Sequence, residues 1–575
     1  MTSGNVLDLS KRGNMSPHYT RELNQVADEI RQEYVSCING LSEACKDNLL
    51  DWFVTPFACR NTYVCSVFED VVKAVFVRSV IDRGDSVDVI IVDTPVVAEM
   101  IGAYIDNSVQ IISKQTFLKY YLFLSYSVFI GLFKYISSAL LRYLSFNLAA
   151  LVSTGKAHVV CNESVTVLET FIYKNSFKGG VLQDRHFNNI QVHLDATQLN
   201  KLLYIPTLYK VHNSFSLFLK AIKSKTNFLF VEEYISVLDI LYPLRHMFFL
   251  NYKHENVNIR NFDISKLVNH SLLRHSTHTS SLYALLKFRF CNNLKKDSAI
   301  RISHIVKWYE NQEVDHGSIM GWRSYSASLN IIGYMGFFSS KNYLCAYPMP
   351  IEHELRVTPD SIGVMGSGLI KQHSIFCDAL SFKVVPSFRF SKPNIKGGSN
   401  ATDMDEIRIF VPLPISEQHV NQILKVITDT SLRSCENSIS FIIKPHPAAV
   451  FSLSGFPDNN GKVRYCVVND SLSAIFDRVD FVLSAASSTV VEAIMHGVAV
   501  LLLSSTQSLR ENVIPDFVPK SLWDEIYCAS ELCGVISQYG QREKLSTPQL
   551  NSLNATLIEL PPNKENISNL LGFLD

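Results

Sequence analysis

Two short polar segments in the last third of the chain have the composition of a phosphate site. Lys444-Pro445-His446-Pro447 directly follows an apolar run, and Ser484-Ala485-Ala486-Ser487-Ser488-Thr489 leads into a helical pattern. The imidazole of His446 can donate a hydrogen bond to a phosphate oxygen, and two prolines restrict the loop that carries it. Hydroxyls and free N–H groups at a helix N-terminus also favour an anion.

Each segment also has a structural interpretation. The first can be a proline-braced turn with an incidental histidine, and in the second Ser487 or Ser488 can cap a helix, with Glu492 completing a capping box. Glu492 can instead reach ribose hydroxyls from one turn into that helix. We favour a nucleotide site because both segments are expected at adjacent strand ends of one domain. Its predicted residues are Lys444, His446, Pro447, Ser487, Ser488, Thr489 and Glu492.

The chain after residue 406 has the pattern of a Rossmann-like domain. Short β-branched runs alternate there with helical patterns, and ligands bind such sheets beyond the carboxyl ends of the strands. The five predicted strands are Ile407–Leu413, Ile439–Ile443, Tyr465–Val468, Asp480–Leu483 and Val498–Leu503.

The half before residue 395 has a less regular alternation, which also predicts a parallel sheet. We expect an N-terminal Rossmann-like domain over 1–395, a linker with paired glycines over 396–406, the second domain over 407–560 and a C-terminal helix over 561–575. The strands expected in the first domain are Val87–Val92, Val109–Ser113, His158–Cys161, Val165–Phe171, Asn330–Tyr334, Ser361–Met365 and Lys383–Val385.

The segment KPHP, followed about 40 residues later by SAASSTVVEAIMHGVAV, resembles the HP and Ser-Ser/Thr motifs of GT-B glycosyltransferases. It is most similar to bacterial sialyltransferases and Kdo transferases, which use CMP-activated acidic sugars. The resemblance implies two Rossmann-like domains facing across a cleft, a metal-independent reaction and no cofactor besides the sugar nucleotide. It also implies that His446 and Ser487 to Thr489 hold the nucleotide, and that the acceptor is a glycan or glycolipid of a surface polysaccharide or lipopolysaccharide.

A second resemblance covers the first half of the chain and points to a group of bacterial surface carbohydrate biosynthesis proteins. Its residues are Trp52, Arg60-Asn61, Asp184-Arg185, Phe187, Trp308-Tyr309-Glu310-Asn311-Gln312, Gly333-Tyr334, Phe338-Ser339, Tyr347-Pro348 and Pro359-Asp360. Met335-Gly336 stands where that group's pattern suggests a histidine, so no catalytic histidine is expected there.

An inverting transferase needs a carboxylate base, and a retaining one needs a nucleophile or an equivalent route; the residues leave both open. Glu310 is the first candidate, because it follows an apolar strand-like stretch and stands beside hydrogen-bonding side chains. Asp93 is the second, at a predicted strand end, with Glu69 and Asp184 behind it. Alternative functions are a UDP- or CDP-dependent transferase, a polyol-phosphate transferase, a sugar-nucleotide epimerase, or a non-catalytic assembly partner.

Metal chemistry has weaker support. Asp403-Met404-Asp405 matches an Asp-x-Asp metal motif, but it precedes a predicted strand where the motif should follow one. His275 and His278 stand three apart, but no carboxylate partner lies at metal-site spacing. No metal site is therefore expected.

Phe117–Val152 is the most apolar stretch, yet its longest charge-free run, Tyr120–Phe133, has 14 residues, short of the roughly 20 that span a bilayer. It can be an insert of one or two buried helices over 116–152, or a helical hairpin in the membrane interface.

Basic and acidic residues balance at 53 each, so nucleic acid is not an expected partner. Twelve scattered cysteines and the absence of an apolar leader predict a cytoplasmic protein with free, buried thiols. The hairpin alternative would place it peripherally at the inner face of the cytoplasmic membrane.

Overall fold

The computed structural model describes residues 5–573 except for 12, 106–108, 154–163, 189, 210, 212, 394–405, 415–416, 436, 447–461, 539–540 and 543. The expected strand at His158–Cys161, the Asp403–Asp405 motif, Pro447 and nearly all of the predicted linker lie outside the described residues.

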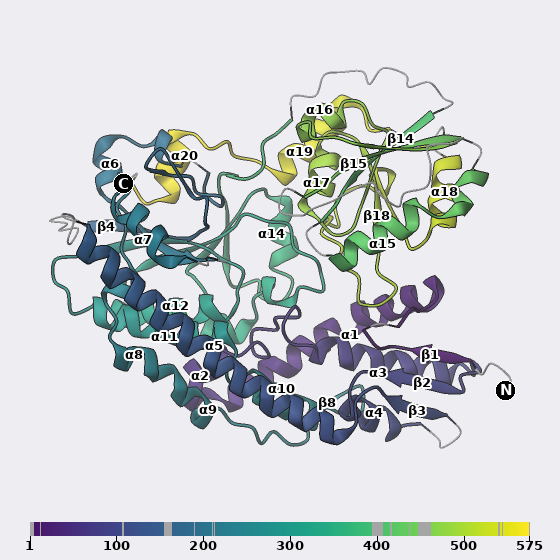
Figure 1. Ribbon diagram of the computed structural model, residues 1–575, viewed down its shortest axis with the longest axis horizontal. Helices are drawn as coiled ribbons and strands as arrows, with labels where there is room; N and C mark the ends of the chain where they lie inside the picture. Colours follow the sequence, from purple (N-terminus) through teal and green to yellow (C-terminus); the bar gives the residue numbers. More distant parts are fainter. Residues whose placement is uncertain are drawn as a thin grey trace.

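Three parallel sheets form the framework (Figure 1). A three-stranded sheet, β1-β2-β3, and two six-stranded sheets follow one another along the chain. The bounds of their strands are Val6–Asp8 (β1), Val89–Val92 (β2), Gln110–Ser113 (β3), Ser164–Ile172 (β4), Leu202–Leu208 (β7), Arg301–Trp308 (β10), Asn330–Met335 (β11), Ser361–Val364 (β12), Ser381–Val384 (β13), Glu406–Pro412 (β14), Ser438–Lys444 (β15), Val463–Val467 (β16), Phe481–Ser484 (β17), Ala499–Leu503 (β18) and Trp523–Ile526 (β19).

Helices connect these strands, as parallel pairing requires. The longer ones are Pro17–Ala44 (α1), Val67–Asp82 (α3), Pro95–Gly102 (α4), Phe117–Val152 (α5), Ser214–Ile222 (α7), Ser265–His275 (α10), Thr279–Leu294 (α11), Glu313–Tyr325 (α12), Glu417–Ile427 (α15), Ser488–Met495 (α17), Ala529–Ser537 (α18) and Thr547–Leu557 (α19).

The first six-stranded sheet has the order β7-β4-β10-β11-β12-β13, so chain order reverses between β4 and β10. Doubly wound sheets bind ligands at this reversal, beyond the carboxyl ends of the strands. The residues before 395 were expected as one Rossmann-like unit, but β1 to β3 form a separate sheet. The short strand β1 and the strand β7 were not predicted.

The second six-stranded sheet has the order β16-β15-β14-β17-β18-β19, and its reversal lies between β14 and β17. All five predicted strands are present within a residue or two, and β19 is a sixth. Two Rossmann-like parallel sheets in one chain confirm the expected α/β, GT-B class. The part of the chain before residue 395 and the part after residue 406 meet at a cavity. Tyr63 and Tyr343 line it from the first part, and Arg510 and Glu511 line it from the second.

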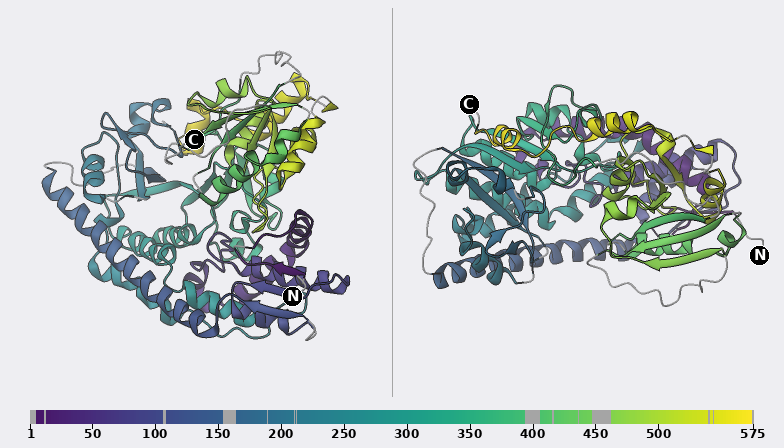
Figure 2. Two further views of the ribbon diagram at one scale, coloured as in Figure 1. Left: turned by 45° about the vertical axis from the view of Figure 1, so that its right-hand side comes forward. Right: turned by 90° about the horizontal axis from the view of Figure 1, so that it is seen from above.

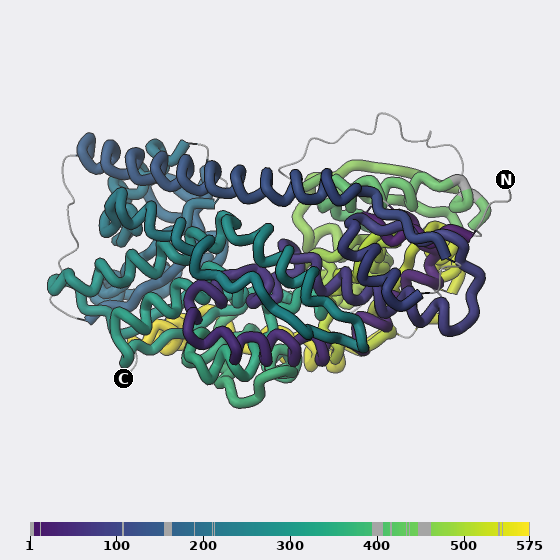
Figure 3. Tube along the Cα trace, turned by 90° about the horizontal axis from the view of Figure 1, so that it is seen from below, coloured from purple at the N-terminus to yellow at the C-terminus, as the bar shows by residue number. Residues whose placement is uncertain are grey.

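The apolar segment forms one continuous helix, α5, which runs the length of the N-terminal half (Figure 3). Tyr120, Tyr135 and Phe146 each reach a different hydrophobic core. Most of the remaining surface is exposed, and only 17% of its most apolar stretch is buried. The expectation of buried helices is therefore wrong, and so is that of a hairpin. α5 is also the one helix in the described part of the chain that is long and apolar enough to cross a membrane.

The end of the chain returns to the first six-stranded sheet (Figure 2). Helix α20, Lys564–Leu570, packs there, and the hydroxyl of Thr166 donates to the carbonyl of Leu571 at 2.8 Å. A second tie lies near the N-terminus, where Arg510 forms an ion pair with Asp28 of α1 at 2.9 Å. The C-terminal helix thus contacts the first six-stranded sheet, and the part that holds the second six-stranded sheet contacts α1 near the N-terminus.

The cysteines differ from the expectation of free, buried thiols. Cys435 and Cys533 form a disulfide that links the segment before β15 to α18, with a Cα–Cα distance of 5.8 Å. Cys466 is free and exposed. Scattered spacing hides such a pair, because the two cysteines are 98 residues apart and meet only through sheet packing.

Candidate functional site

A cavity of about 560 Å³ lies at the carboxyl ends of β4, β7 and β10, where the first six-stranded sheet reverses its chain order. Aromatic and aliphatic side chains form much of its wall, and charged groups converge on it. The residues that line it include Arg142, Glu169, Tyr173, His186, Tyr283, Lys287, Trp308, Glu310, Gln312 and Asp315.

Glu310, the first predicted catalytic residue, lines this cavity two residues after β10. Its Oε1 accepts the indole N–H of Trp308 at 2.7 Å. Its Oε2 accepts the amide of Gln312 and the hydroxyl of Tyr343, both at 2.9 Å. Burial raises the pKa of Glu310, and the hydrogen bonds from Trp308 and Tyr343 oppose that rise. The carboxylate is therefore fixed in direction and more basic than an exposed one.

The loop that carries Glu310 is held by Asp315 in the first turn of α12. Its Oδ2 accepts the backbone N–H groups of Glu310 and Gln312, each at 3.1 Å. The ammonium of Lys307, buried at the end of β10, lies 3.0 Å from the other oxygen of Asp315. The position of Glu310 therefore depends on the buried ion pair between Lys307 and Asp315, because Asp315 holds its backbone.

Glu169 on β4 is a site residue that the sequence reasoning missed. It is buried, accepts the hydroxyl of Ser318 and the indole N–H of Trp322 at 2.8 Å each, and lies 3.3 Å from both Lys287 and Lys307. Burial alone would raise its pKa, but the two lysines and these hydrogen bonds lower the pKa to about 2. A carboxylate inside an apolar strand was the signal available in the sequence.

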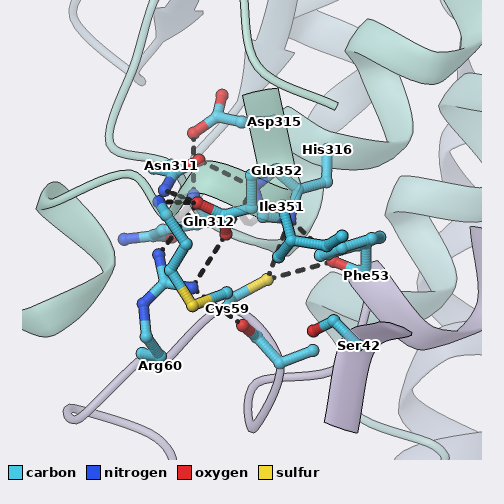
Figure 4. Close-up of polar contacts among 12 residues, drawn as sticks. Ser42, Phe53, Cys59, Arg60, Asn311, Gln312, Asp315, His316, Ile351 and Glu352 are labelled. Carbon is cyan, nitrogen blue, oxygen red and sulfur yellow. Dashed lines mark hydrogen bonds and ion pairs between the residues drawn. The ribbon is translucent and has the colours of Figure 1, made fainter. Parts of the chain in front are cut away.

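A second buried network joins the Glu310 loop to two distant segments (Figure 4). Arg60 binds Glu352 through two parallel hydrogen bonds, at 2.9 and 3.1 Å. Asn311 donates to the same carboxylate at 3.2 Å and accepts from Tyr309 at 2.6 Å. His316 adds a contact to Asn311 at 2.7 Å.

This network accounts for several residues of the second resemblance, because Arg60, Tyr309, Asn311 and Tyr347 all belong to it. Arg60 also donates to the carbonyl of Tyr347 at 3.2 Å. Asn311 has a φ of 58°, in the left-handed region, where asparagine is among the better tolerated residues. The motif around Glu310 is thus held from three parts of the chain.

The other candidate carboxylates lie elsewhere. Asp93, at the end of β2, accepts the backbone N–H of Lys11 at 3.0 Å and belongs to the three-stranded sheet, so it is not brought together with Glu310. Glu69 forms an ion pair with Lys73 at 2.8 Å. Asp184 accepts the backbone N–H groups of His186 and Phe187 at 2.8 and 3.1 Å, so its carboxylate stabilises the turn that begins at this residue.

The segment Ser484–Thr489 begins at the end of β17, where the second six-stranded sheet reverses its chain order. Ser487 is the N-cap of α17, and its Oγ accepts the backbone N–H of Thr489 at 3.3 Å. Because the third position of the helix is Val490, Glu492 cannot complete a capping box, and that expectation is wrong. The carboxylate of Glu492 has no hydrogen bond or ion pair within the described part of the chain, and it is half-buried.

His446 follows β15, one strand further from the reversal. The sheet order places β14 between β15 and β17, so the two predicted phosphate segments flank the end of β14 and are not on adjacent strands. Neighbouring strands are separated by about 4.8 Å, so the two strand ends stand roughly 10 Å apart. The ammonium group of Lys444 donates a hydrogen bond to the backbone carbonyl of Asp470.

Within the described residues, no group of three or more His, Cys, Asp or Glu side chains is arranged to hold a metal ion. His275 is buried and lies 3.3 Å from the hydroxyl of Ser271. Burial lowers the pKa of His275 to about 3, and that of the half-buried His278 to about 4. This histidine pair therefore packs as neutral side chains.

No protein-family model matches the sequence, and no curated protein matches it. Solved structures with a distant likeness include Anabaena HepE in complex with UDP and glucose, at 9% identity over 71% of this chain and 100% of that chain, with a TM-score of 0.36. Acinetobacter baumannii MurG has 11% identity, the same coverages and a TM-score of 0.38. A structure of S. aureus MnaA with UDP has 10% identity over 71% of this chain and 95% of that chain, with a TM-score of 0.37. TM-scores this low do not establish a fold, and the α/β class follows from the strand order of the parallel sheets.

Proposed function

We propose that this protein is a glycosyltransferase that takes a sugar from a nucleotide donor and transfers it to a hydroxyl group of a glycan or glycolipid. The observation that carries the proposal is Glu310: a carboxylate with a raised pKa, held by three hydrogen bonds, in a cavity at the reversal of a Rossmann-like sheet. A general base needs this combination of basicity, fixed direction and access.

In this mechanism the acceptor occupies the cavity and Glu310 removes the proton of its attacking hydroxyl. Three donors keep the carboxylate in one orientation, so little reorganisation is needed before attack. The aromatic walls, Tyr173, Tyr283 and Trp308, suit the apolar faces of a sugar ring or a lipid-linked glycan. For a retaining reaction the same carboxylate would be the nucleophile.

The donor would bind on the second six-stranded sheet. The N-terminus of α17, with Ser487, Ser488 and Thr489, offers N–H groups and hydroxyls to a phosphate, and Glu492 is available for ribose hydroxyls. His446 would contact the same nucleotide from the far side of β14. We propose a CMP-linked acidic sugar as donor because of the KPHP and Ser-Ser-Thr motifs. A UDP- or CDP-linked donor, a polyol-phosphate transfer and an epimerase reaction on the same sheet are the alternatives.

The test is calorimetric titration of the whole chain with CMP, UDP and CDP, followed by nucleotide release from the matching sugar nucleotide with membrane extract as acceptor. We expect CMP to bind, and His446→Ala and Ser488→Ala to weaken it. Glu310→Gln should keep nucleotide binding and lower transfer by about 10²- to 10⁴-fold. Tighter binding of UDP would replace the CMP donor by a UDP donor, and the absence of binding by all three nucleotides would refute the transferase.

We further propose that the protein works at a membrane surface through α5. The helix carries three cationic residues and no acidic one, which complements anionic headgroups. Leu118, Phe129 and Phe133 are 71%, 65% and 63% exposed, and an apolar face of this extent favours a lipid interface. Because Arg142 of the same helix lines the Glu310 cavity, a membrane-bound acceptor would enter beside its own bilayer.

A further inference from the structure

Three ring side chains on the wall of the Glu310 cavity form a continuous shelf, which we call the aromatic shelf: Tyr173, His186 and Trp308. The hydroxyl of Tyr173 lies 3.0 Å from Nε2 of His186. The rings of His186 and Trp308 are 4.3 Å apart between centroids. Trp308 in turn donates to Glu310, so the shelf leads directly to the proposed base.

A guanidinium group lies over each end of the aromatic shelf. Arg185 is 5.6 Å from the centroid of Tyr173, and Arg389 is 5.7 Å from the centroid of Trp308. Both side chains are exposed. Neither has an ion pair or a hydrogen bond within the described part of the chain, so two positive charges flank one edge of the cavity without a bound carboxylate.

The charges of both arginines act on the middle of the shelf. Burial lowers the pKa of His186, and Arg389 and Arg185 lower it further, to about 3, so this imidazole is neutral at physiological pH. It neither adds to the positive charge nor neutralises it. Like charges held near one another repel until an anion lies between them.

Arg389 also connects the two halves of the proposed active site. Its charge favours the ionised form of Glu310 on one side and of Glu492, in α17 of the second sheet, on the other. The charge of Arg389 therefore acts on both the proposed base and a carboxylate of the proposed donor site. An anionic group in this space would lie where a sugar nucleotide must place its reacting end.

We infer that Arg185 and Arg389 together bind an oxyanion of the sugar nucleotide, over the aromatic shelf and beside Glu310. The group is either a phosphate or the carboxylate of an acidic sugar, since a guanidinium fork fits both with paired hydrogen bonds. The rings beneath the arginines limit their motion, so little side-chain freedom is lost on binding. This inference deepens the function proposed above and rests on it for the identity of the ligand.

The experiment is calorimetry on the full chain with three probes: inorganic pyrophosphate, CMP and N-acetylneuraminate. The variants are Arg185→Gln and Arg389→Gln. Arg274→Gln is the matched control, because Arg274 lies over Phe123 at 5.2 Å, likewise without an ion pair in the described residues and on a different surface. Each charge-assisted hydrogen bond lost should weaken binding about tenfold or more.

We expect both glutamine variants to weaken at least one probe by that factor, while Arg274→Gln leaves all three unchanged. Losses with pyrophosphate and CMP identify a phosphate, and a loss confined to N-acetylneuraminate identifies a carboxylate. Arg389→Lys keeps the charge without the planar fork and should fall between the wild type and Arg389→Gln. The Arg389→Lys variant replaces Arg389→Gln in the test if the glutamine variant does not fold.

Two results would overturn the inference: probes that bind the wild type and both glutamine variants equally, or no binding of any probe to the wild type. The first leaves the proposed transferase standing. If pyrophosphate binding depends on the arginines but CMP, UDP and CDP do not bind, the oxyanion site stands and the transferase falls.

Discussion

The indole N–H of Trp308 donates to Oε1 of Glu310 at 2.7 Å, at the point where β10 ends and the cavity begins. This bond stabilises the ionised form of the carboxylate, whereas burial stabilises the protonated form. The basicity of Glu310 is thus set by the balance between its burial and its donors.

Replacing Trp308 by Phe removes one of these donors and keeps an aromatic ring. The pKa of Glu310 should rise further, so the acidic limb of the pH profile of kcat/KM should move to higher pH. The measurement is the rate of nucleotide release from pH 5 to 9. Trp523→Phe, an indole on the second sheet whose buried N–H has no partner in the described residues, is the control and should leave the profile in place. An unshifted limb in Trp308→Phe would exclude Glu310 as the titrating base.

Glu313 should make the protein less stable as pH rises. Burial raises the pKa of this carboxyl to about 7, with Asn61 donating to it at 3.1 Å. The folded state therefore binds more protons than the unfolded state between about pH 4.5 and 7, and stability falls across that window. Glu313→Gln should remove up to about 3 kcal/mol of this fall.

The measurement for Glu313 is urea unfolding at pH 5 and pH 8. The exposed Glu559 provides a control, since Glu559→Gln should leave the difference between the two pH values unchanged. An equal pH dependence in the wild type and Glu313→Gln would contradict the prediction.

Breaking the buried Arg60–Glu352 pair from one side should be costly. Arg60→Met leaves Glu352 buried without its partner, and such changes destabilise by about 3–5 kcal/mol. Adding Glu352→Gln removes the uncompensated charge and should restore part of that loss. Thermal unfolding of both single variants and the double variant measures the coupling. Strictly additive effects would show that the pair does not act as a unit.

The exposed face of α5 should determine membrane binding. Phe129→Glu with Phe133→Glu places two charges on this face without touching a core, so the protein should stay folded. Its co-sedimentation with vesicles containing anionic lipid should weaken about tenfold or more. Ile375→Glu, at a site that is 57% exposed elsewhere on the chain, is the control. Equal sedimentation of the wild type and the double variant would rule out α5 as the membrane contact.

Local patterning predicted much of the second sheet. Five of its six strands were expected within a residue or two, because buried parallel strands are continuous apolar runs bounded by polar turns. Strand neighbours could not be predicted in this way. Pairing depends on contacts between distant segments, so the position of β14 between the two phosphate segments emerged only in the folded chain.

The long apolar segment shows a different limit. A helix that is apolar on all sides suits a protein core and a lipid interface equally well, so its sequence left the choice open. Only the placement of α5 along the outside of the N-terminal half, with most of its surface exposed, excluded a helix buried in the protein core.

The sequence by itself determined the parallel α/β class and the strand-end position of the Ser487–Thr489 segment, and it made Glu310 the first candidate carboxylate. These follow from periodicity and from polar residues at strand ends, which are local properties. The tertiary structure decided what surrounds them. Glu169 meets its lysines, Arg60 meets Glu352, and Arg185 and Arg389 reach the two ends of one shelf. Charges and hydrogen-bond donors far apart in the chain gain their effect only when folding brings them within a few ångströms of one another.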